Sequence, residues 1–237
     1  MERIAFQGVT NIIRFNWHFY VIAMCCIAFC IIIHQPLIIF LIVFSTVLSL
    51  AVSWYVYDYT DLYTLTWLDI DTPAQIININ AGFDETSACL AAKYPAAQLT
   101  VLDFYDPAKH TEISIERARK AYGAYPGTIV ISTSEMPLQS SDMIVLMFAA
   151  HEIRDRAERI LFFKQLGQSL NYKGQIVVLE HLRDLPNFIA YNIGFFHFFS
   201  KREWMHTFNA AGLSVAKETK LTPFLSAFIL QRNGIAS

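Results

Sequence analysis

The chain has 237 residues and a net charge of −2, so its length fits one sizeable core with an additional element, and its charge gives no basic surface for nucleic acid. Apolar residues make up 54% of the sequence and the mean hydropathy is +0.36, which is high for a soluble α/β domain. The four cysteines have neither the spacing of a metal site nor that of a disulfide framework. Composition therefore favours a protein with a membrane-associated part and without a nucleic-acid partner.

The apolar excess is concentrated near the N-terminus. No Asp, Glu, Lys or Arg occurs between Arg14 and Asp58, and two long apolar runs in this span are separated only by His34-Gln35-Pro36. Because a bilayer core needs about 20 apolar residues per helix, this pattern predicts a hairpin of two transmembrane helices within residues 1–57. A cleaved signal peptide and a hairpin that lies in the membrane interface are the alternatives.

The charges around the hairpin predict its orientation. Arg3 and Arg14 precede the first apolar run, and the break between the runs carries no fixed charge. The positive-inside rule then places the N-terminus and, after two crossings, the large C-terminal domain in the cytoplasm. We therefore predict a multi-pass protein of the cell membrane, with residues 58–74 as a connector and with the hairpin apart from any ligand site of the domain.

The domain is predicted to cover residues 75–237 and to open with a βαβ unit. An apolar strand leads into a turn at Gly82, a helix over residues 85–94 is ended by the proline that follows, and a second strand ends on Asp103. A carboxylate about 20 residues after a glycine turn is spaced to bind the hydroxyls of a ribose. The single glycine is a weak signal, so an ordinary βαβ unit without a ligand is the alternative.

The rest of the domain continues the alternation of strands and helices. Continuous apolar strands separated by helices are typical of a parallel sheet covered on both faces, and ligands of such sheets lie at the carboxyl ends of the strands. The predicted fold is therefore a Rossmann-like, doubly wound, mostly parallel α/β sheet that closes with a pair of strands. The predicted strands are 127–132, 142–148, 175–179, 213–218 and 224–232, and the predicted helices are 112–122, 149–170 and 201–211.

In the order of these motifs, residues 72–232 resemble the class I S-adenosylmethionine (SAM)-dependent methyltransferases. The segment Asn78-Ile79-Asn80-Ala81-Gly82-Phe83-Asp84 stands at the place of the glycine-rich first motif of that family, and Asp103 at the place of its ribose-binding acid. The resemblance implies SAM as the cofactor and the fold of that class, with an antiparallel last strand. It implies cofactor contacts from Asn80, Ala81, Gly82, Asp84, Asp103, Phe104, Ser134, Glu135 and Phe148.

The chain departs from the family pattern at three positions. Asn78 and Asn80 replace an acid and the first glycine of the motif, and Ser132 stands where an acid often contacts the adenine amine. The cationic sulfonium of SAM needs negative or dipolar surroundings, which Asp84, Asp103 and Glu135 can supply. The departures keep open a second interpretation, in which the chain binds SAM or a nucleotide without catalysis.

Three histidines that follow predicted strand ends are candidates for a general base. Methyl transfer to oxygen often needs a base, and histidine suits that role near neutral pH. His197 and His151 are the preferred pair over His181, because His197 lies in an aromatic segment where the resembled family has its acceptor-binding insertion. Apolar neighbours are expected to desolvate His197. The alternative is that each is an ordinary hydrogen-bonded histidine; no set of metal ligands is predicted.

Together these features predict a membrane-anchored methyltransferase that acts on a lipophilic small molecule, at a phenolic or other hydroxyl of a pigment, quinone or lipid. Membrane lipid is the second expected partner, and the aromatic segment Leu185–Phe199 is either a further membrane contact or a lid over the donor. The alternative is a catalytically inactive, membrane-tethered scaffold or partner subunit that binds SAM or a nucleotide. An NAD-dependent oxidoreductase is disfavoured, because the three-glycine fingerprint is missing.

Overall fold

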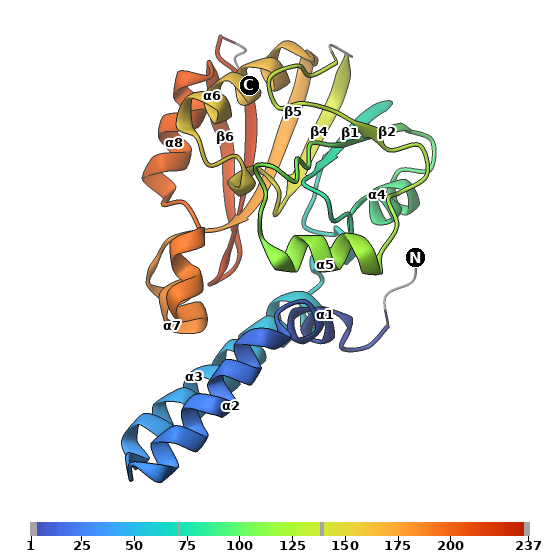
Figure 1. The fold of residues 1–237 in the computed structure, drawn as a ribbon. Coiled ribbons are helices and arrows are strands. Elements are labelled where there is room, and N and C mark those ends of the chain that lie inside the picture. Colours follow the sequence, from blue (N-terminus) through green and yellow to red (C-terminus); the bar gives the residue numbers. More distant parts are fainter. Residues whose placement is uncertain (1–3, 71, 138–139, 235–237) are drawn as a thin grey trace.

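The computed structural model describes residues 4–70, 72–137 and 140–234. Within this part of the chain, a seven-stranded sheet is covered by helices on both faces, and a helical hairpin extends away from it (Figure 1). Arg3, on which part of the predicted orientation depends, lies outside the described residues. The strands are β1 (Gln75–Asn80), β2 (Gln98–Asp103), β3 (Ile129–Val130), β4 (Ser141–Met147), β5 (Leu170–His181), β6 (Leu213–Thr222) and β7 (Leu225–Arg232).

The order of the strands is β3-β2-β1-β4-β5-β7-β6. Strand β1 lies between β2 and β4 and is parallel to both, whereas β7 is antiparallel to its neighbours β5 and β6. The predicted mostly parallel, doubly wound sheet with an antiparallel last strand is therefore confirmed. Asn80 is paired with Asp103 in the register of β1 and β2, so the loops that follow these strands leave at the same edge of the sheet.

The helix predicted over residues 149–170 is shorter than predicted. The Asp155 side chain accepts a hydrogen bond from the backbone N–H of Glu158 and so caps α6 at its N-terminus, and residues Ala150–Glu152 form a separate 3-10 turn. His151 therefore lies on a turn directly after β4 instead of on the amphipathic helix. The helices of the domain are α4 (Ser87–Lys93), α5 (Ile113–Ala121), α6 (Arg156–Gln168), α7 (Leu185–Tyr191) and α8 (Lys201–Ala210).

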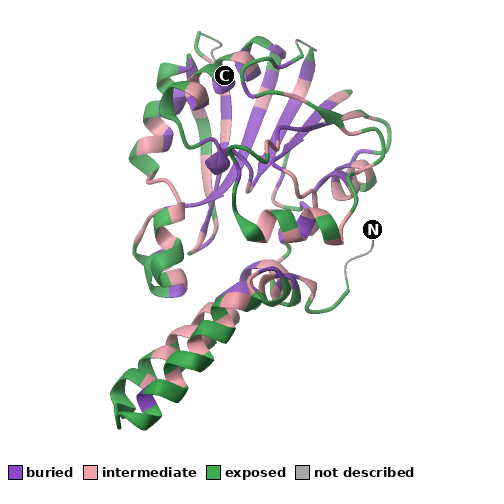
Figure 2. Cartoon of the chain, viewed as in Figure 1, coloured by how far each residue is buried: buried purple, intermediate pink, exposed green. Residues whose placement is uncertain are grey.

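Apolar side chains pack on both faces of the sheet, and Figure 2 shows the buried residues concentrated there. One face packs against α6 and α8, and the other packs against residues of the segment predicted to be a connector. Leu62, Leu65 and Leu68 of that segment are at most 2% exposed. Residues 58–74 are thus more than a tether, because their leucines complete the core on one face of the sheet.

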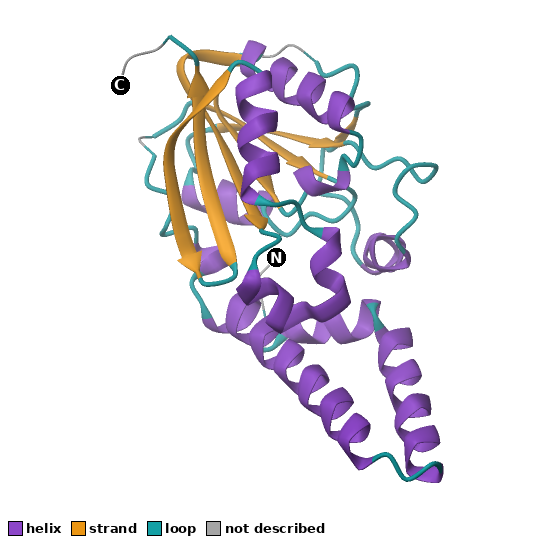
Figure 3. Ribbon diagram, turned by 90° about the vertical axis from the view of Figure 1, so that its left-hand side faces the viewer, coloured by secondary structure: helices purple, strands orange, loops and turns teal. Residues whose placement is uncertain are grey.

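The N-terminal residues form α1 (Gln7–Phe15), α2 (Trp17–Ile32) and α3 (Pro36–Trp54), and α2 and α3 make the hairpin (Figure 3). In the described part of the chain, one helical stretch, Pro36–Thr64, is long and apolar enough to cross a membrane by itself. Helices α1 and α2 meet the same test only as a pair, and they are bent by 69° at their junction. The two complete crossings predicted from the sequence are therefore not established by the helices alone.

Helix α1 packs on the domain instead of extending the hairpin. The Asp58 carboxylate accepts hydrogen bonds from the backbone N–H groups of Gly8 and Val9, at 2.7 and 2.8 Å, which satisfies the first turn of α1. Gly8 is needed for this approach, since a Cβ atom there would lie 2.4 Å from the Cβ of Tyr57. At the other end of α1, the Phe15 ring packs edge-on against Phe83, which directly follows Gly82. The structure thus differs from the predicted separation of the N-terminal segment from the ligand site.

One buried histidine joins the hairpin to the sheet. His181, at the end of β5, donates from Nδ1 to the side-chain oxygen of Asn187 (3.0 Å) and to the carbonyl of Phe224 (3.1 Å). Its Nε2 therefore accepts from the Tyr57 hydroxyl, at 2.8 Å, in the turn that follows α3. Burial lowers the pKa of His181 to about 4, so the imidazole is neutral at physiological pH.

We expect Tyr57→Phe to lower the free energy of unfolding by about 1–3 kcal/mol, because it leaves Nε2 of His181 buried without a donor. Denaturant unfolding of the full chain in detergent measures this change. The matched control is Tyr59→Phe, since Tyr59 is 67% exposed. Equal stability of the two variants would show that the Tyr57 hydroxyl does not stabilise the junction between hairpin and sheet.

Candidate active site

A first hollow of about 360 Å³ lies at the carboxyl ends of β1 and β2. Gly82 lies in the loop after β1 with a φ of 99°, and a Cβ atom there would come within 3.0 Å of the side chains of Tyr105 and Arg119. Only glycine fits this conformation without displacing its neighbours. The hollow is lined by Asn80, Gly82, Asp84, Asp103, Arg119, Tyr122, Gly123, Ala124, Tyr125 and Thr128.

The acid at the end of β2 is buried and ion-paired. Oδ2 of Asp103 lies 2.5 Å from Nη1 of Arg119, and Oδ1 accepts from the backbone N–H of Tyr105 at 2.9 Å. The Arg119 guanidinium also lies over the Tyr105 ring, 4.4 Å from its centroid, and donates to the carbonyl of Gly82. The carboxylate predicted to bind a ribose is thus covered by a cation from α5, and a ligand hydroxyl would have to displace it.

Asp84 holds the start of α4. Its Oδ1 accepts from the backbone N–H groups of Thr86 and Ser87, both at 2.9 Å, and from the amide of Asn78 at 3.3 Å. Its Oδ2 and the Oδ1 of Asn78 are buried and have no hydrogen-bond partner among the described residues. Asp84 therefore has a structural role, and one of its oxygens is available to a donor group on a ligand.

A second hollow, of about 530 Å³, lies on the other side of the same loop. Residues 80, 82 and 84 line the first hollow, whereas Ala81 and Phe83 line the second together with Phe148 and Glu152. Phe148 follows β4 with a φ of 54°, which is uncommon for a bulky residue and turns the chain sharply after the strand. The two hollows thus lie on either side of the β1–α4 loop, at the carboxyl ends of the strands where ligands of parallel sheets bind.

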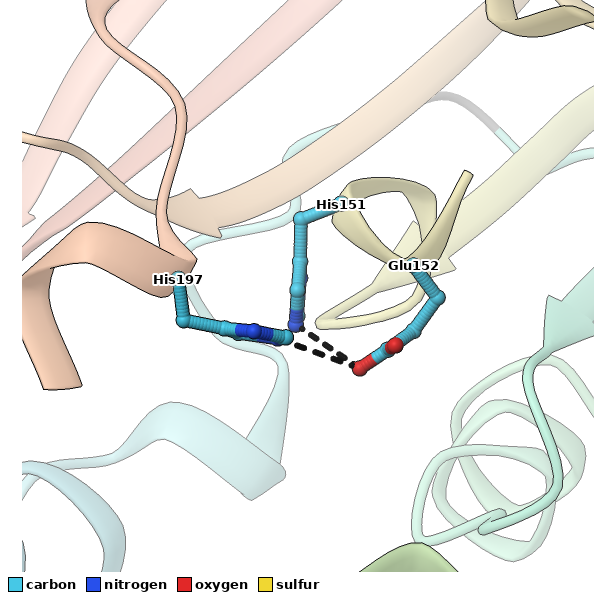
Figure 4. Close-up of side chains that lie close together, drawn as sticks. All are labelled: His151, Glu152 and His197. Atoms are coloured by element: carbon cyan, nitrogen blue, oxygen red, sulfur yellow. Dashed lines mark hydrogen bonds and ion pairs between the residues drawn. The ribbon is translucent and has the colours of Figure 1, made fainter. Parts of the chain in front are cut away.

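Glu152 connects the second hollow to a cluster of histidines. The Nε2 atoms of His151 and His197 lie 3.2 and 3.3 Å from Oε1 of Glu152, and the three side chains point toward one another (Figure 4). The rings of the two histidines meet edge-on, with centroids 4.8 Å apart. The Nδ1 atom of His151 lies 2.7 Å from Glu180, and that of His197 lies 2.9 Å from Glu112. The structure therefore brings the two predicted histidines together, although 46 residues separate them in the sequence.

The carboxylates determine the charge of this cluster. Burial acts to lower the pKa of His151, but Glu180 and Glu152 raise it to about 10. Burial likewise opposes the charged form of His197, yet Glu112 and Glu152 raise its pKa above the ordinary value. Burial would raise the pKa of Glu152, whereas its hydrogen bonds to the two histidines hold it well below its usual range. The expected desolvation of His197 by apolar neighbours is thus outweighed by two carboxylates.

The predicted cofactor contacts divide into three groups. Asn80, Gly82, Asp84 and Asp103 line the first hollow, and Ala81 and Phe148 line the second. Three predicted residues line neither hollow. Phe104 is 2% exposed and packs on Phe162, and Ser134 and Glu135 are exposed on a loop that bends back on itself.

That loop is held away from both hollows by α6. The side chain of Gln165 donates to the carbonyl of Thr133 at 3.1 Å and accepts from the backbone N–H of Met136 at 2.9 Å. Since β3 has only two residues, the chain leaves the sheet early and Ser134 with Glu135 turns outward. Sequence reasoning missed Arg119, Glu112, Glu152 and Glu180, whose partners are distant in the chain or lie on elements whose boundaries it placed wrongly.

The sequence matches no protein-family model and no curated protein. Several solved structures are similar to this chain. The mitomycin 7-O-methyltransferase MmcR has a TM-score of 0.55 and 14% sequence identity, and the match covers 72% of this chain and 52% of that chain. Human N-acetylserotonin methyltransferase in complex with SAM has a TM-score of 0.52 and 15% identity, and the match covers 80% of this chain and 55% of that chain. A third is a dimethyltransferase, RosA from Streptomyces davawensis, which acts on an 8-amino-8-demethyl-D-riboflavin (TM-score 0.55, 9% identity, 78% and 56%).

The domain has the class I methyltransferase fold. The strand order and the antiparallel β7 agree with this fold. At sequence identities of 9–17%, the similarity to the solved structures shows the fold alone. The chain spans about half the length of the solved methyltransferases it matches. The names of these proteins show that one methylates an oxygen and another an amino nitrogen, so the fold does not identify the acceptor.

Proposed function

We propose that this chain is a membrane-anchored, SAM-dependent methyltransferase that transfers a methyl group to a hydroxyl of a lipophilic small molecule. The observation that carries the proposal is the pair of hollows on either side of the β1–α4 loop, one lined by Asp103 and the other by Glu152. The fold and the human neighbour with bound SAM support the identity of the donor. Methyl transfer needs a donor site next to an acceptor site, and the hollows are lined by adjacent residues of one loop.

The donor is assigned to the first hollow. Asp103 would accept hydrogen bonds from the ribose hydroxyls, and the unpartnered Oδ2 of Asp84 offers a second acceptor. The backbone of Gly82 allows close approach, because no side chain separates it from the ligand. For the ribose to reach Asp103, the Arg119 guanidinium has to rotate away, and the 35% exposure of its side chain permits this.

We expect Asp103→Ala to weaken binding of S-adenosylhomocysteine by at least about tenfold, because each hydrogen bond to a charged group contributes about 1.5–3 kcal/mol. Isothermal titration of the full chain in detergent measures the affinity. The matched control is Glu116→Gln on the exposed face of α5, whose ion pair with Lys120 faces solvent. Absence of binding both by the unsubstituted protein and by Arg119→Gln would overturn the assignment of the donor.

The ion pair between Asp103 and Arg119 also favours a second candidate, a scaffold that no longer turns over. In such a protein Arg119 would cover the acid permanently. The variant Arg119→Gln separates the two candidates. Donor binding that appears only in this variant would identify Arg119 as a fixed plug and favour the inactive scaffold.

The acceptor is assigned to the second hollow, where Glu152 would receive its hydroxyl group. His197 is the preferred base because its side chain is 26% exposed, whereas the side chain of His151 is 10% exposed and is fixed on Glu180. In the ligand-free arrangement His197 is held charged between two carboxylates. To act as a base, His197 first has to release its Nε2 proton to solvent as the acceptor separates it from Glu152. The neutral imidazole then takes the proton of the acceptor hydroxyl as the methyl group leaves SAM, while His151 orients the Glu152 carboxylate.

We expect His197→Ala to lower kcat for methyl transfer by about 10²–10⁴-fold while the affinity for S-adenosylhomocysteine stays unchanged. His151→Ala is expected to act in the same direction. His206→Ala, an exposed histidine on α8, serves as the control. Turnover of labelled SAM with extracted membrane lipids and pigments measures the rate, and an unchanged kcat in His197→Ala would remove the histidine from the mechanism.

Membrane attachment is assigned to the hairpin of α2 and α3. At 1.5 Å per residue, the 16 residues of α2 span about 24 Å and the 19 residues of α3 span about 28 Å, against a hydrocarbon core of about 30 Å. Most side chains of the hairpin are apolar and exposed, and a surface of this kind in water is unfavourable (Figure 2). We place the domain in the cytoplasm, with the hairpin crossing the cell membrane twice.

We expect Met24→Asp with Phe44→Asp to release the protein from membranes, because a charge near the bilayer centre costs about 2.5–3.5 kcal/mol per residue. Flotation on a density gradient measures the association. The control is Tyr172→Asp, since Tyr172 is 71% exposed on the domain.

Labelling of the hairpin tip separates a crossing from an interfacial hairpin. Gln35→Cys in a background without the four native cysteines is expected to react with an impermeant maleimide from the side opposite to the domain. Reaction from the same side as Tyr172→Cys would contradict two crossings.

A further inference from the structure

The cluster around Glu152 has the geometry of a metal site. Both histidines point Nε2 at the same carboxylate oxygen, and both hold Nδ1 against a second carboxylate, Glu180 for His151 and Glu112 for His197. Histidines that bind metals almost always donate their other ring N–H to a carboxylate, carbonyl or water, which fixes the tautomer and presents the free nitrogen to the ion. In this cluster both histidines have that second contact, and both free nitrogens converge.

The distances fit a first-row divalent ion. With metal–ligand bonds of about 2.0–2.1 Å, two ligand atoms of a tetrahedral site lie about 3.3 Å apart. The two Nε2 atoms lie 3.2 and 3.3 Å from Oε1 of Glu152, and the three ligand atoms all lie within 4.8 Å of one another. A movement of at most about 1.5 Å by one imidazole therefore brings all three to bonding distance.

The charges in the cluster are a second, independent observation that points to a bound cation. Glu180 is fully buried and Glu152 is 8% exposed, and buried carboxylates need a compensating positive charge. Among the described residues no lysine or arginine forms an ion pair with either of them. Arg154, which lies nearby, donates to the backbone carbonyls of His151 and His197 instead, and so ties the two ligand-bearing segments together. The protonated imidazoles of His151 and His197 supply that charge, and one divalent ion held between the neutral imidazoles would take the place of their protons.

We propose that His151, Glu152 and His197 bind one divalent transition-metal ion through two imidazole nitrogens and a carboxylate oxygen, with Glu180 and Glu112 orienting the imidazoles. Two imidazoles and one carboxylate suit Zn²⁺, and the same ligand set suits Fe²⁺ and Co²⁺, whereas Mg²⁺ and Ca²⁺ prefer oxygen ligands alone. Because Glu152 lines the second hollow, the ion would lie at the edge of that hollow. With the ion bound, Nε2 of His197 would be a ligand and the ion would take over activation of an acceptor hydroxyl; that step rests on the proposed function, whereas binding of the ion does not.

The test uses the full chain in detergent, stripped with a chelator and titrated with Zn²⁺ and, separately, Co²⁺. We expect one equivalent per chain, and absorption bands of four- or five-coordinate Co²⁺ in the visible range. His197→Ala should weaken binding at least about 100-fold, and Glu112→Gln about 10–100-fold, since loss of an orienting carboxylate costs that much. Both side chains are partly exposed, so these variants are expected to fold. His206→Ala should bind as the unsubstituted protein does.

Two results would overturn the proposal. One is the absence of stoichiometric Zn²⁺ binding by the unsubstituted protein. The other is binding that persists in His197→Ala and is lost in Cys25→Ser with Cys26→Ser, which would place the ion on the two exposed cysteines of α2. Both measurements are independent of donor binding and of turnover. Metal binding can therefore be tested even if the methyltransferase assay fails.

Discussion

The hydrogen bond from the Tyr57 hydroxyl to His181 joins the parts of this molecule that the sequence keeps apart. His181 ends β5, and its ring is stacked between Phe148, which follows β4, and Phe198, from the aromatic segment after α7. Phe148 in turn lines the second hollow. The neutral imidazole therefore links the end of the hairpin, two loops of the sheet and one wall of the candidate active site. A charged ring in this position would need a solvation that the buried site does not provide.

Two buried acids near the hollows are balanced in different ways. Asp103 has a dedicated cation, Arg119, at hydrogen-bonding distance, and this pair needs nothing further. Glu152 has only imidazoles, whose charge depends on a proton or on an ion in its place. The ion pair of Asp103 with Arg119 stays closed until a ligand displaces the arginine. Around Glu152, the protons on the imidazoles can be replaced by an ion without movement of the backbone. This contrast is consistent with a binding role for the first hollow and a chemical role for the second.

The sequence was most informative where structure is determined locally. The β1–α4–β2 unit was predicted nearly to the residue, because apolar strands, a glycine turn and a proline stop are all visible within 30 residues. The start of α6 was missed because Asp155 caps it, and a capping residue inside a long amphipathic pattern is easily read as part of the helix.

Long-range pairs had no signal of that kind. Arg119 looks like an ordinary surface residue of α5 until the fold places it on Asp103, and Glu112 looks like a helix-start residue until it meets His197. Leu62, Leu65 and Leu68 fall within the predicted connector, because their burial depends on a sheet formed later in the chain. By contrast, His151 and His197 were found by chemistry alone, and the structure then brought their side chains together.

The 69° bend between α1 and α2 has a consequence for the height of the domain above a bilayer. If α2 runs along the membrane normal, α1 runs nearly parallel to the surface and acts as a spacer beneath α5, as the arrangement in Figure 1 illustrates. The thickness of one helix, about 10 Å, then separates the loops around the hollows from the headgroups. A lipophilic molecule would have to rise by roughly that distance to be modified, which favours acceptors whose reactive group ends a chain or a flexible ring system over those buried flat among the acyl tails.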